Sequence, residues 1–134
     1  MIQTPSDWKI TEKGSDTIYT GKTDGGSVVI SSASAVPTIE SVKRDQVPQL
    51  EKQGKAIKVA DVKSQTMPNG TTIIYVVYTS ESNVDQYTRK SSLLDNVTWY
   101  FYKNKKLAAL TLWAPKGTAN ANLWKQISES FMWM

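Results

Sequence analysis

The chain has 134 residues and a formal net charge of +4, and it contains neither cysteine nor histidine. This length suits one domain spanning residues 1–134, in which a single core buries about two thirds of the surface that the unfolded chain exposes. Without cysteine, disulfides and thiolate chemistry are excluded; without histidine, the usual general base at neutral pH and the commonest zinc ligand are missing. The composition therefore predicts no metal site and no cofactor.

The positive charge is scattered, with local density in two lysine groups (Lys52, Lys55 and Lys58; Lys103, Lys105 and Lys106). Neither group forms a basic stripe with interleaved exposed aromatics, so nucleic-acid binding is not favoured. A mild positive field favours an acidic partner.

The N-terminal residues leave the cellular location open between two alternatives. No window of about 18 apolar residues is present, so we expect membrane association only through an N-terminal anchor that has been removed. The polar lead at residues 1–8 fits a native cytoplasmic start, and it equally fits a chain cut just after an export signal. If the chain was cut after an export signal, the protein is predicted to be extracytoplasmic, that is, exported or lipid-anchored. If its start is native, the protein is predicted to be cytoplasmic.

Three short strands are predicted in the first third of the chain, at residues 7–14, 16–23 and 26–34. The first alternates Trp8 and Ile10 with polar neighbours, and turn residues separate the three segments. The pattern predicts an antiparallel meander.

After Pro37 the apolar period changes and predicts a helix. Thr38 is the candidate N-cap, and Gly54 suits the position that ends the helix. The expected apolar face consists of Ile39, Val42, Val47 and Leu50. Pro48 lacks a backbone donor and clashes with the preceding turn, so a kink or a restart of the helix is expected near Asp45.

Two further strands are predicted on either side of an Asn69-Gly70 turn. Residues 55–68 alternate apolar and polar side chains with a slip before Val62, which predicts a strand with one wet face. Residues 71–80 are apolar at both parities, which predicts an interior strand covered on both faces.

Residues 79–96 lack periodicity and form the longest predicted irregular segment. Segments of this length in compact domains tend to be functional or disordered. Tyrosine and arginine are the residue types that carry interface energy, so the candidate partner contacts are Asp85, Tyr87, Arg89 and Lys90. An ordinary solvated loop explains the same residues equally well.

Residues 97–113 predict a hairpin whose two loop residues are Asn104 and Lys105, with Tyr102 opposite Leu107. One face is then unbroken core, formed by Val97, Trp99, Phe101, Ala108, Leu110 and Leu112. The other is amphipathic with small residues in the middle, formed by Thr98, Tyr100, Tyr102, Leu107, Ala109, Thr111 and Trp113. We expect a helix to lie across this second face, with an exposed aromatic platform as the alternative.

The last segment, residues 120–134, predicts a helix that docks on the sheet. Asn120 or Asn122 is the candidate N-cap. The residues at helical spacing are Leu123, Ile127, Phe131 and Met134.

The order of these elements resembles a known superfamily. The residues that carry the resemblance are the helix "TIESVKRDQVPQLEKQGKAIKV", the turn and strand "MPNGTTIIYVVYT", and the terminal "W..ISESF.W". They are similar to the PsbP extrinsic proteins of photosystem II, the Ran-binding protein Mog1, and bacterial LpqN-like and DcrB-like lipoproteins or secreted proteins. Plant-type members have been associated with metal sites that use histidine, and that role does not carry over to a chain without histidine.

The resemblance implies an α+β fold, with a single antiparallel sheet of about six strands and helices on both faces. It also implies a non-enzymatic binding or assembly module, with many bacterial members exported or lipid-anchored.

The sequence leaves three candidate functions. The first is an interaction domain that binds another protein through residues 79–96. The second is a carrier of a small molecule or acidic ligand in a gap between the C-terminal helix and the sheet, lined by Tyr100, Tyr102, Trp113 and Trp124.

The third function, catalysis, is not favoured, and no catalytic residue is assigned. The candidate carboxylates are scattered without a pairing that their spacing enforces; they are Asp7, Asp16, Asp24, Asp61, Asp85, Asp95 and Glu129.

Overall fold

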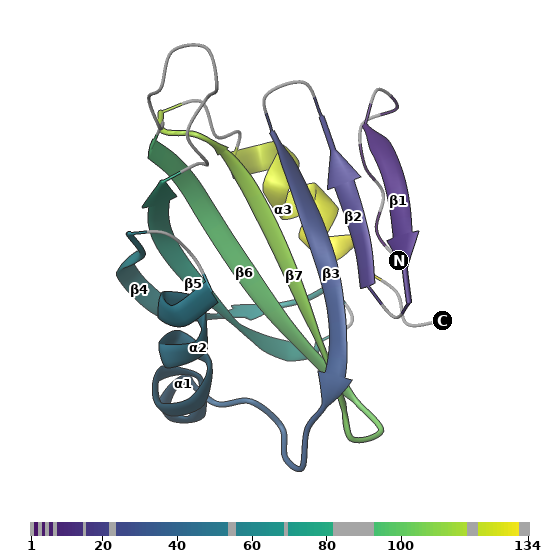
Figure 1. The fold of residues 1–134 in the computed structure, drawn as a ribbon. Helices are drawn as coiled ribbons and strands as arrows, with labels where there is room; N and C mark the ends of the chain where they lie inside the picture. Colours follow the sequence, from purple (N-terminus) through teal and green to yellow (C-terminus); the bar gives the residue numbers. More distant parts are fainter. Residues whose placement is uncertain are drawn as a thin grey trace.

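One antiparallel sheet organises the protein (Figure 1). The computed structural model describes residues 2, 4, 6, 8–14, 16–21, 24–53, 56–68, 70–81, 93–117 and 121–131, with backbone alone at Gln53 and Ala121. The strands are β1 (Lys9–Lys13), β2 (Asp16–Thr20), β3 (Gly25–Ser32), β4 (Lys58–Thr66), β5 (Thr72–Glu81), β6 (Leu93–Lys103) and β7 (Lys106–Pro115). Their order across the sheet is β1-β2-β3-β7-β6-β5-β4. Within the described residues the sheet therefore has seven strands, one more than the resemblance implied.

The first three strands form the predicted meander, with β1 at the edge of the sheet. All five residues of β1 are exposed, and Ile10 keeps 53% of its surface in contact with solvent. Trp8, one residue before the strand, is buried. The predicted alternation therefore fails within β1, because an edge strand need not bury its apolar positions against a neighbouring layer.

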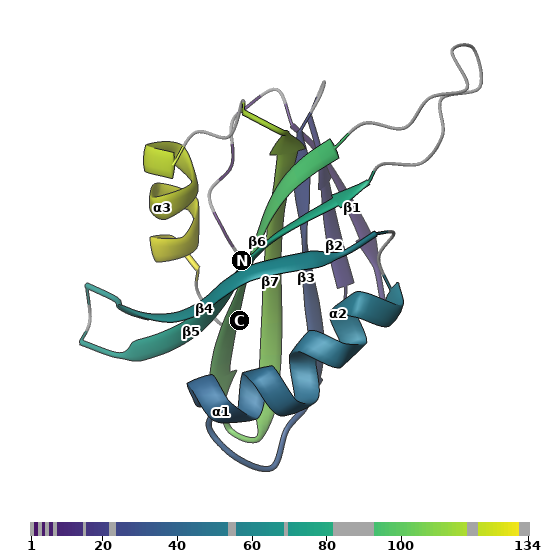
Figure 2. The ribbon, with the colours of Figure 1, turned by 90° about the vertical axis from the view of Figure 1, so that its left-hand side faces the viewer.

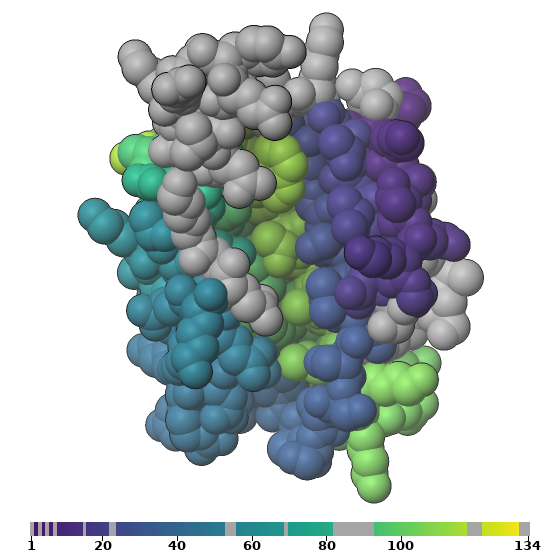
Figure 3. Space-filling view, viewed as in Figure 1, coloured from purple at the N-terminus to yellow at the C-terminus, as the bar shows by residue number. Residues whose placement is uncertain are grey.

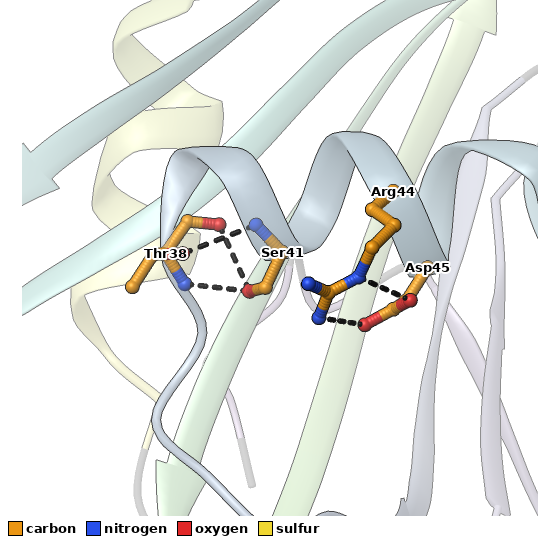
Figure 4. A network of polar contacts seen from close by, with 4 residues as sticks. All are labelled: Thr38, Ser41, Arg44 and Asp45. Atoms are coloured by element: carbon orange, nitrogen blue, oxygen red, sulfur yellow. Dashed lines mark hydrogen bonds and ion pairs between the residues drawn. The ribbon is translucent and has the colours of Figure 1, made fainter.

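A continuous helical segment follows, made of α1 (Ile39–Ser41), the π-helical turn η1 (Val42–Gln46) and α2 (Val47–Gln53). Thr38 is the N-cap, as predicted, and forms a capping box with Ser41 (Figure 4). The Ser41 amide donates to Thr38 Oγ1 at 3.1 Å, and the Thr38 amide donates to Ser41 Oγ at 2.8 Å. Two amides that the helix itself cannot satisfy thus find partners.

The irregularity expected near Asp45 is the π-helical turn. Pro48 cannot donate to the carbonyl four residues earlier, and the widened turn instead directs the Val47 amide to the carbonyl of Val42. Within this turn, Arg44 binds the Asp45 carboxylate with two hydrogen bonds of 2.9 Å (Figure 4), which lower the pKa of Asp45. Gly54, the predicted helix stop, lies outside the described residues.

The slip expected in the next strand is a β-bulge. The register between β4 and β5 shifts between Val59 and Asp61, and Val62 is buried beyond it. The turn after β4 is closed by a 2.9 Å hydrogen bond from the Gly70 amide to the Met67 carbonyl, while Asn69 lies outside the described residues. Interior strand β5 buries successive residues on opposite faces, such as Ile73 and Ile74, as its two apolar parities predicted.

The segment predicted to be irregular is shorter than 79–96. Strand β5 continues to Glu81 and β6 begins at Leu93, and the two pair to their ends, with Thr79 opposite Asp95. Backbone pairing extends both strands through polar residues such as Thr79, Ser80 and Asp95, where the side chains show no strand periodicity. Residues 82–92, between the two strands, lie outside the described residues.

The hairpin of β6 and β7 has the predicted register, with Tyr102 opposite Leu107 and Phe101 opposite Ala108. Asn104 and Lys105 form its two-residue loop, and their φ angles of 52° and 61° are those of a type I′ turn. This register separates the side chains of the two strands into two clusters, which lie on opposite faces of the sheet.

The first cluster joins the sheet to α3 (Ala121–Glu129). Its strand members include all six residues predicted as core, with Val97 only partly buried. Trp124 and Ile127 of α3 pack on them, and Phe131, just beyond the helix, stacks on Phe101 with ring centroids 4.1 Å apart. Asn122 lies inside α3 and is not its N-cap, while Asn120 and Met134 lie outside the described residues.

The second cluster joins β4, β5 and the hairpin to the other helical segment. It contains Val42, Val62, Ile74, Val76, Tyr78, Tyr100 and Leu107, with Val47 and Leu50 partly buried against it. Ile39, the remaining residue of the predicted helix face, is 37% exposed. Figure 2 shows α3 on one side of β7 and α2 on the other.

Candidate functional site

A groove with a volume of about 400 Å³ lies between α2 and the sheet. Its described lining comes from β3, α2, β5, β6 and β7 and from the turns beside them: Ser27, Val29, Ser31, Gln46, Gln49, Leu50, Ile57, Tyr78, Thr98, Tyr100, Leu107, Ala109 and Thr111. Figure 3 shows the surface hollowed between the teal helical segment and the blue strand β3, with yellow-green β7 in between.

The groove exists because short side chains occupy the middle of this sheet face. Val29, Ala109 and Tyr100 pair side by side across β3, β7 and β6, and Ser27, Thr111 and Thr98 form the neighbouring row. Val29 is 41% exposed, so the sheet face is open beside α2. A helix covers part of the second hairpin face, as predicted, and the small residues leave space next to it.

A chain of three hydroxyl groups runs along the floor of the groove. Tyr78 Oη lies 3.0 Å from Thr98 Oγ1, which in turn lies 2.8 Å from Thr111 Oγ1. Thr98 is 1% exposed and Tyr78 is 5% exposed, so the chain lies at the bottom of the groove. Buried hydroxyls need such partners, because an unpaired one loses its hydrogen bonds to water.

Tyr100 lies beside this chain with its hydroxyl unused. The residue is 3% exposed and lines the groove, and its hydroxyl makes no hydrogen bond with any described residue. Burial raises its pKa well above the ordinary value, and the nearby Tyr78 raises it further. Burial also raises the pKa of Tyr78, so both hydroxyls remain protonated donors at neutral pH.

No charged side chain is found among the described residues that line the groove. An acidic ligand would therefore lose its hydration without meeting a cation there. Within the described part of the chain, no group of three or more potential metal ligands among His, Cys, Asp and Glu is present. None of the described helices is long and apolar enough to span a bilayer.

The four predicted ligand-lining residues are not gathered in one place. Tyr100 lines the groove, whereas Tyr102 and Trp113 share its sheet face without lining the groove. Trp124 belongs to the first cluster, on the opposite face. Successive side chains of β6 point to opposite faces of the sheet. Trp99 and Phe101 therefore face α3, whereas Tyr100 faces the other side and does not line the predicted gap under the C-terminal helix.

The other candidate residues are dispersed. The predicted partner contacts Asp85, Tyr87, Arg89 and Lys90 lie outside the described residues, as do the carboxylates Asp7 and Asp85. Asp61 lies 3.6 Å from Lys63 on exposed β4, and Asp95 accepts a hydrogen bond of 3.0 Å from the Gly117 amide. Neither contact brings two carboxylates to one site.

Sequence reasoning placed Thr98 and Thr111 on the correct face without treating them as site residues. The hairpin register already placed Thr98 opposite Thr111, and this pairing could have identified them as neighbouring site residues. The contributions of Ser27, Gln46 and Gln49 depend on the pairing of β3 with β7 and on how α2 docks. No local sequence pattern carries that information.

No protein-family model and no curated protein matches the sequence. Among solved structures, cyanobacterial PsbP from Synechocystis sp. PCC 6803 is similar, with a TM-score of 0.58 and 14% identity over 96% of this chain and 83% of that one. A protein of unknown function from Pseudomonas aeruginosa, described as a candidate regulator, is also similar, with a TM-score of 0.54 and 14% identity over 96% and 99% of the two chains.

At this identity the two likenesses show the fold alone. The chain has a PsbP-like fold, as the order of its elements predicted.

Proposed function

We propose that this protein is a non-catalytic binding domain that holds its ligand in the groove between α2 and the sheet. The observation that carries the proposal is the open, half-covered sheet face with its buried hydroxyl chain and the unused hydroxyl of Tyr100. Ligand sites in proteins are mostly apolar concavities of about 300–1,000 Å³ with a few convergent polar groups, and the groove fits this description.

The chemistry of the lining supports binding over catalysis. General acid and base catalysis needs groups whose pKa lies near the working pH. The titratable groups among the described lining are Tyr78 and Tyr100, and burial moves the pKa of each further from neutrality. Uncharged hydroxyl and amide groups can orient a ligand without activating it.

A fragment screen followed by NMR tests the proposal. We expect fragments to shift the amide signals of Ser27, Ala109 and Thr111, because these residues line the floor of the groove. Ala109→Leu should fill the groove and abolish the shifts, whereas Ala60→Leu, at an exposed position of β4, should retain them. A screen without any shift in these amides, or one in which Ala109→Leu binds as wild type does, would count against the groove.

We propose that the protein is one domain arranged as an α/β/α sandwich. The separation of the buried residues into two clusters, each with its own helix, supports this arrangement. We also propose that the protein is exported or surface-associated, as the resemblance implies. Fractionation of the source cells, with detection by an antibody against the domain, tests that location.

Protein binding near residues 82–92 is the second candidate function. It is favoured by Leu93, a large apolar residue that starts β6 and is 48% exposed. A pull-down should compare the wild type with Leu93→Ser and with Val36→Ser, a matched control at a 61% exposed site far from β6 in sequence. A partner lost by Leu93→Ser alone supports this function, and a partner indifferent to both changes argues against it.

A further inference from the structure

We infer that the groove selects an uncharged, amphipathic small molecule whose oxygen atoms accept hydrogen bonds from Tyr100 and from the hydroxyl chain. The inference rests on the proposed function and adds the chemical class of the ligand. It follows from three features of the lining: surplus hydrogen-bond donors, absent charge and apolar walls.

The hydroxyl chain can offer one donor to a ligand. Tyr78, Thr98 and Thr111 each carry a single O–H group, and together they share two hydrogen bonds. These two contacts use two of the three protons. Thr111 is also a hydrogen-bonding neighbour of Tyr78 and lowers its pKa, so the third proton serves a ligand when it turns away from Tyr78. Thr111 is the partly exposed member of the chain and lines the groove, so it is the hydroxyl that can present this proton at the floor.

Tyr100 supplies a second, independent donor. Its side chain is almost fully buried in the wall of the groove, and no described residue accepts its proton. Among the described residues, the Tyr19 hydroxyl is the one side-chain oxygen that is both sealed from solvent and without a partner. The Tyr100 hydroxyl also lacks a partner, so it is not sealed and is open to the groove. A ligand oxygen placed there gains a donor that the protein leaves unused.

The remaining lining specifies an uncharged and partly apolar body. Val29, Leu50, Ile57, Leu107 and Ala109 contribute aliphatic surface, and Gln46 and Gln49 contribute neutral amides. A carboxylate or an ammonium group would be desolvated without a counter-ion among the described lining residues. A carbonyl, amide or ester oxygen on an aliphatic body meets donors and apolar walls together.

Three probes with the same ten-carbon chain test the class of ligand: decanamide, decanoate and decylammonium. Their affinities for the intact protein are measured by calorimetry, and their site is located by the amide signals of Ser27 and Thr111. We expect decanamide to bind at least about tenfold more tightly than either charged probe. Tyr100→Phe and Thr111→Val should each weaken decanamide about 3- to 10-fold, the range expected for one neutral hydrogen bond.

Tyr102→Phe is the matched control, because Tyr102 lies on the same strand and face but does not line the groove. It should change the affinity less than twofold. Tyr100→Phe should keep the wild-type melting temperature, since the hydroxyl that it removes has no partner among the described residues. A clear loss of stability would show that this hydroxyl is already engaged, and it would overturn the inference.

The remaining outcomes separate the ligand class from the proposed function. If other fragments shift the groove amides but decanamide does not bind, or binds no better than decanoate, the ligand class is wrong and the function stands. The same conclusion follows if decanamide binds equally well to wild type, Tyr100→Phe and Thr111→Val. If no fragment and no probe reaches the groove, both proposals fail.

Discussion

Neighbouring aromatic residues of β6 lie in different surroundings. Trp99 and Phe101 are buried against α3, whereas Tyr100 faces the other cluster and Tyr102 is only partly buried on that same face. Trp99 also donates from its indole nitrogen to Gln65 Oε1 at 3.2 Å. The energetic importance of each ring therefore depends on its parity and on its distance from the end of the hairpin.

This arrangement predicts unequal costs for three alanine substitutions. Trp99→Ala and Phe101→Ala should each lower the free energy of unfolding by about 3–5 kcal/mol, because each leaves a cavity in the larger cluster. Tyr102→Ala should cost much less, since its ring rims the core. Urea denaturation of the three variants measures the difference, and equal losses would show that the assignment of faces is wrong.

At the scale of elements, two local irregularities fix how longer segments meet. The π-helical turn Val42–Gln46 accommodates Pro48 while Val42 stays buried in the second cluster. The type I′ turn at Asn104 and Lys105 sets the register of β6 and β7, and hence the composition of both faces. A lysine at positive φ is an unusual choice for such a turn, because glycine adopts this conformation more readily.

Lys105→Gly should therefore stabilise the protein by about 0.5–1 kcal/mol, as relief of the left-handed backbone outweighs the added freedom of the unfolded chain. Lys103→Gly is the control within the same hairpin. It lies in β6, where glycine only weakens the strand, and it should destabilise by a similar amount. The urea midpoints of the two variants test this prediction. A midpoint for Lys105→Gly below that of the wild type would contradict the turn assignment.

At the scale of the whole molecule, the titratable groups give a simple dependence of stability on pH. The sequence has no histidine and no cysteine, so no side chain has an ordinary pKa between about 5 and 8. Burial raises the pKa of Tyr78 and Tyr100 in the folded protein above that of the unfolded chain. Above about pH 10 the unfolded state loses these protons first, and unfolding becomes more favourable.

We expect the free energy of unfolding to be nearly constant from pH 6 to 8 and to fall above about pH 10, by up to about 1.4 kcal/mol for each pH unit and each buried tyrosine. The stability from these groups is complete below the unfolded pKa and is lost as the pH rises toward the folded pKa. Tyr100→Phe should make the alkaline decline shallower. Denaturation curves from pH 6 to 11 test this, and an equally steep decline in the variant would exclude Tyr100 as a cause.

Local patterns in the sequence determined most of the fold. The Thr38 cap, the irregularity before Pro48, the slip before Val62 and the register of the β6–β7 hairpin all follow from interactions within a few residues or across one turn. Such features depend on backbone dihedral preferences and on side-chain period, which a sequence displays directly.

Only the tertiary structure decided where the groove lies. Its lining joins Ser27 of β3 to Gln49 of α2 and Thr98 of β6, and these residues meet only once β3 pairs with β7 and the helix docks beside them. It also placed Tyr100 and Trp124 on opposite faces and extended β5 and β6 through polar residues. Contacts between distant segments depend on how whole surfaces pack together, and no local period in the sequence encodes that choice.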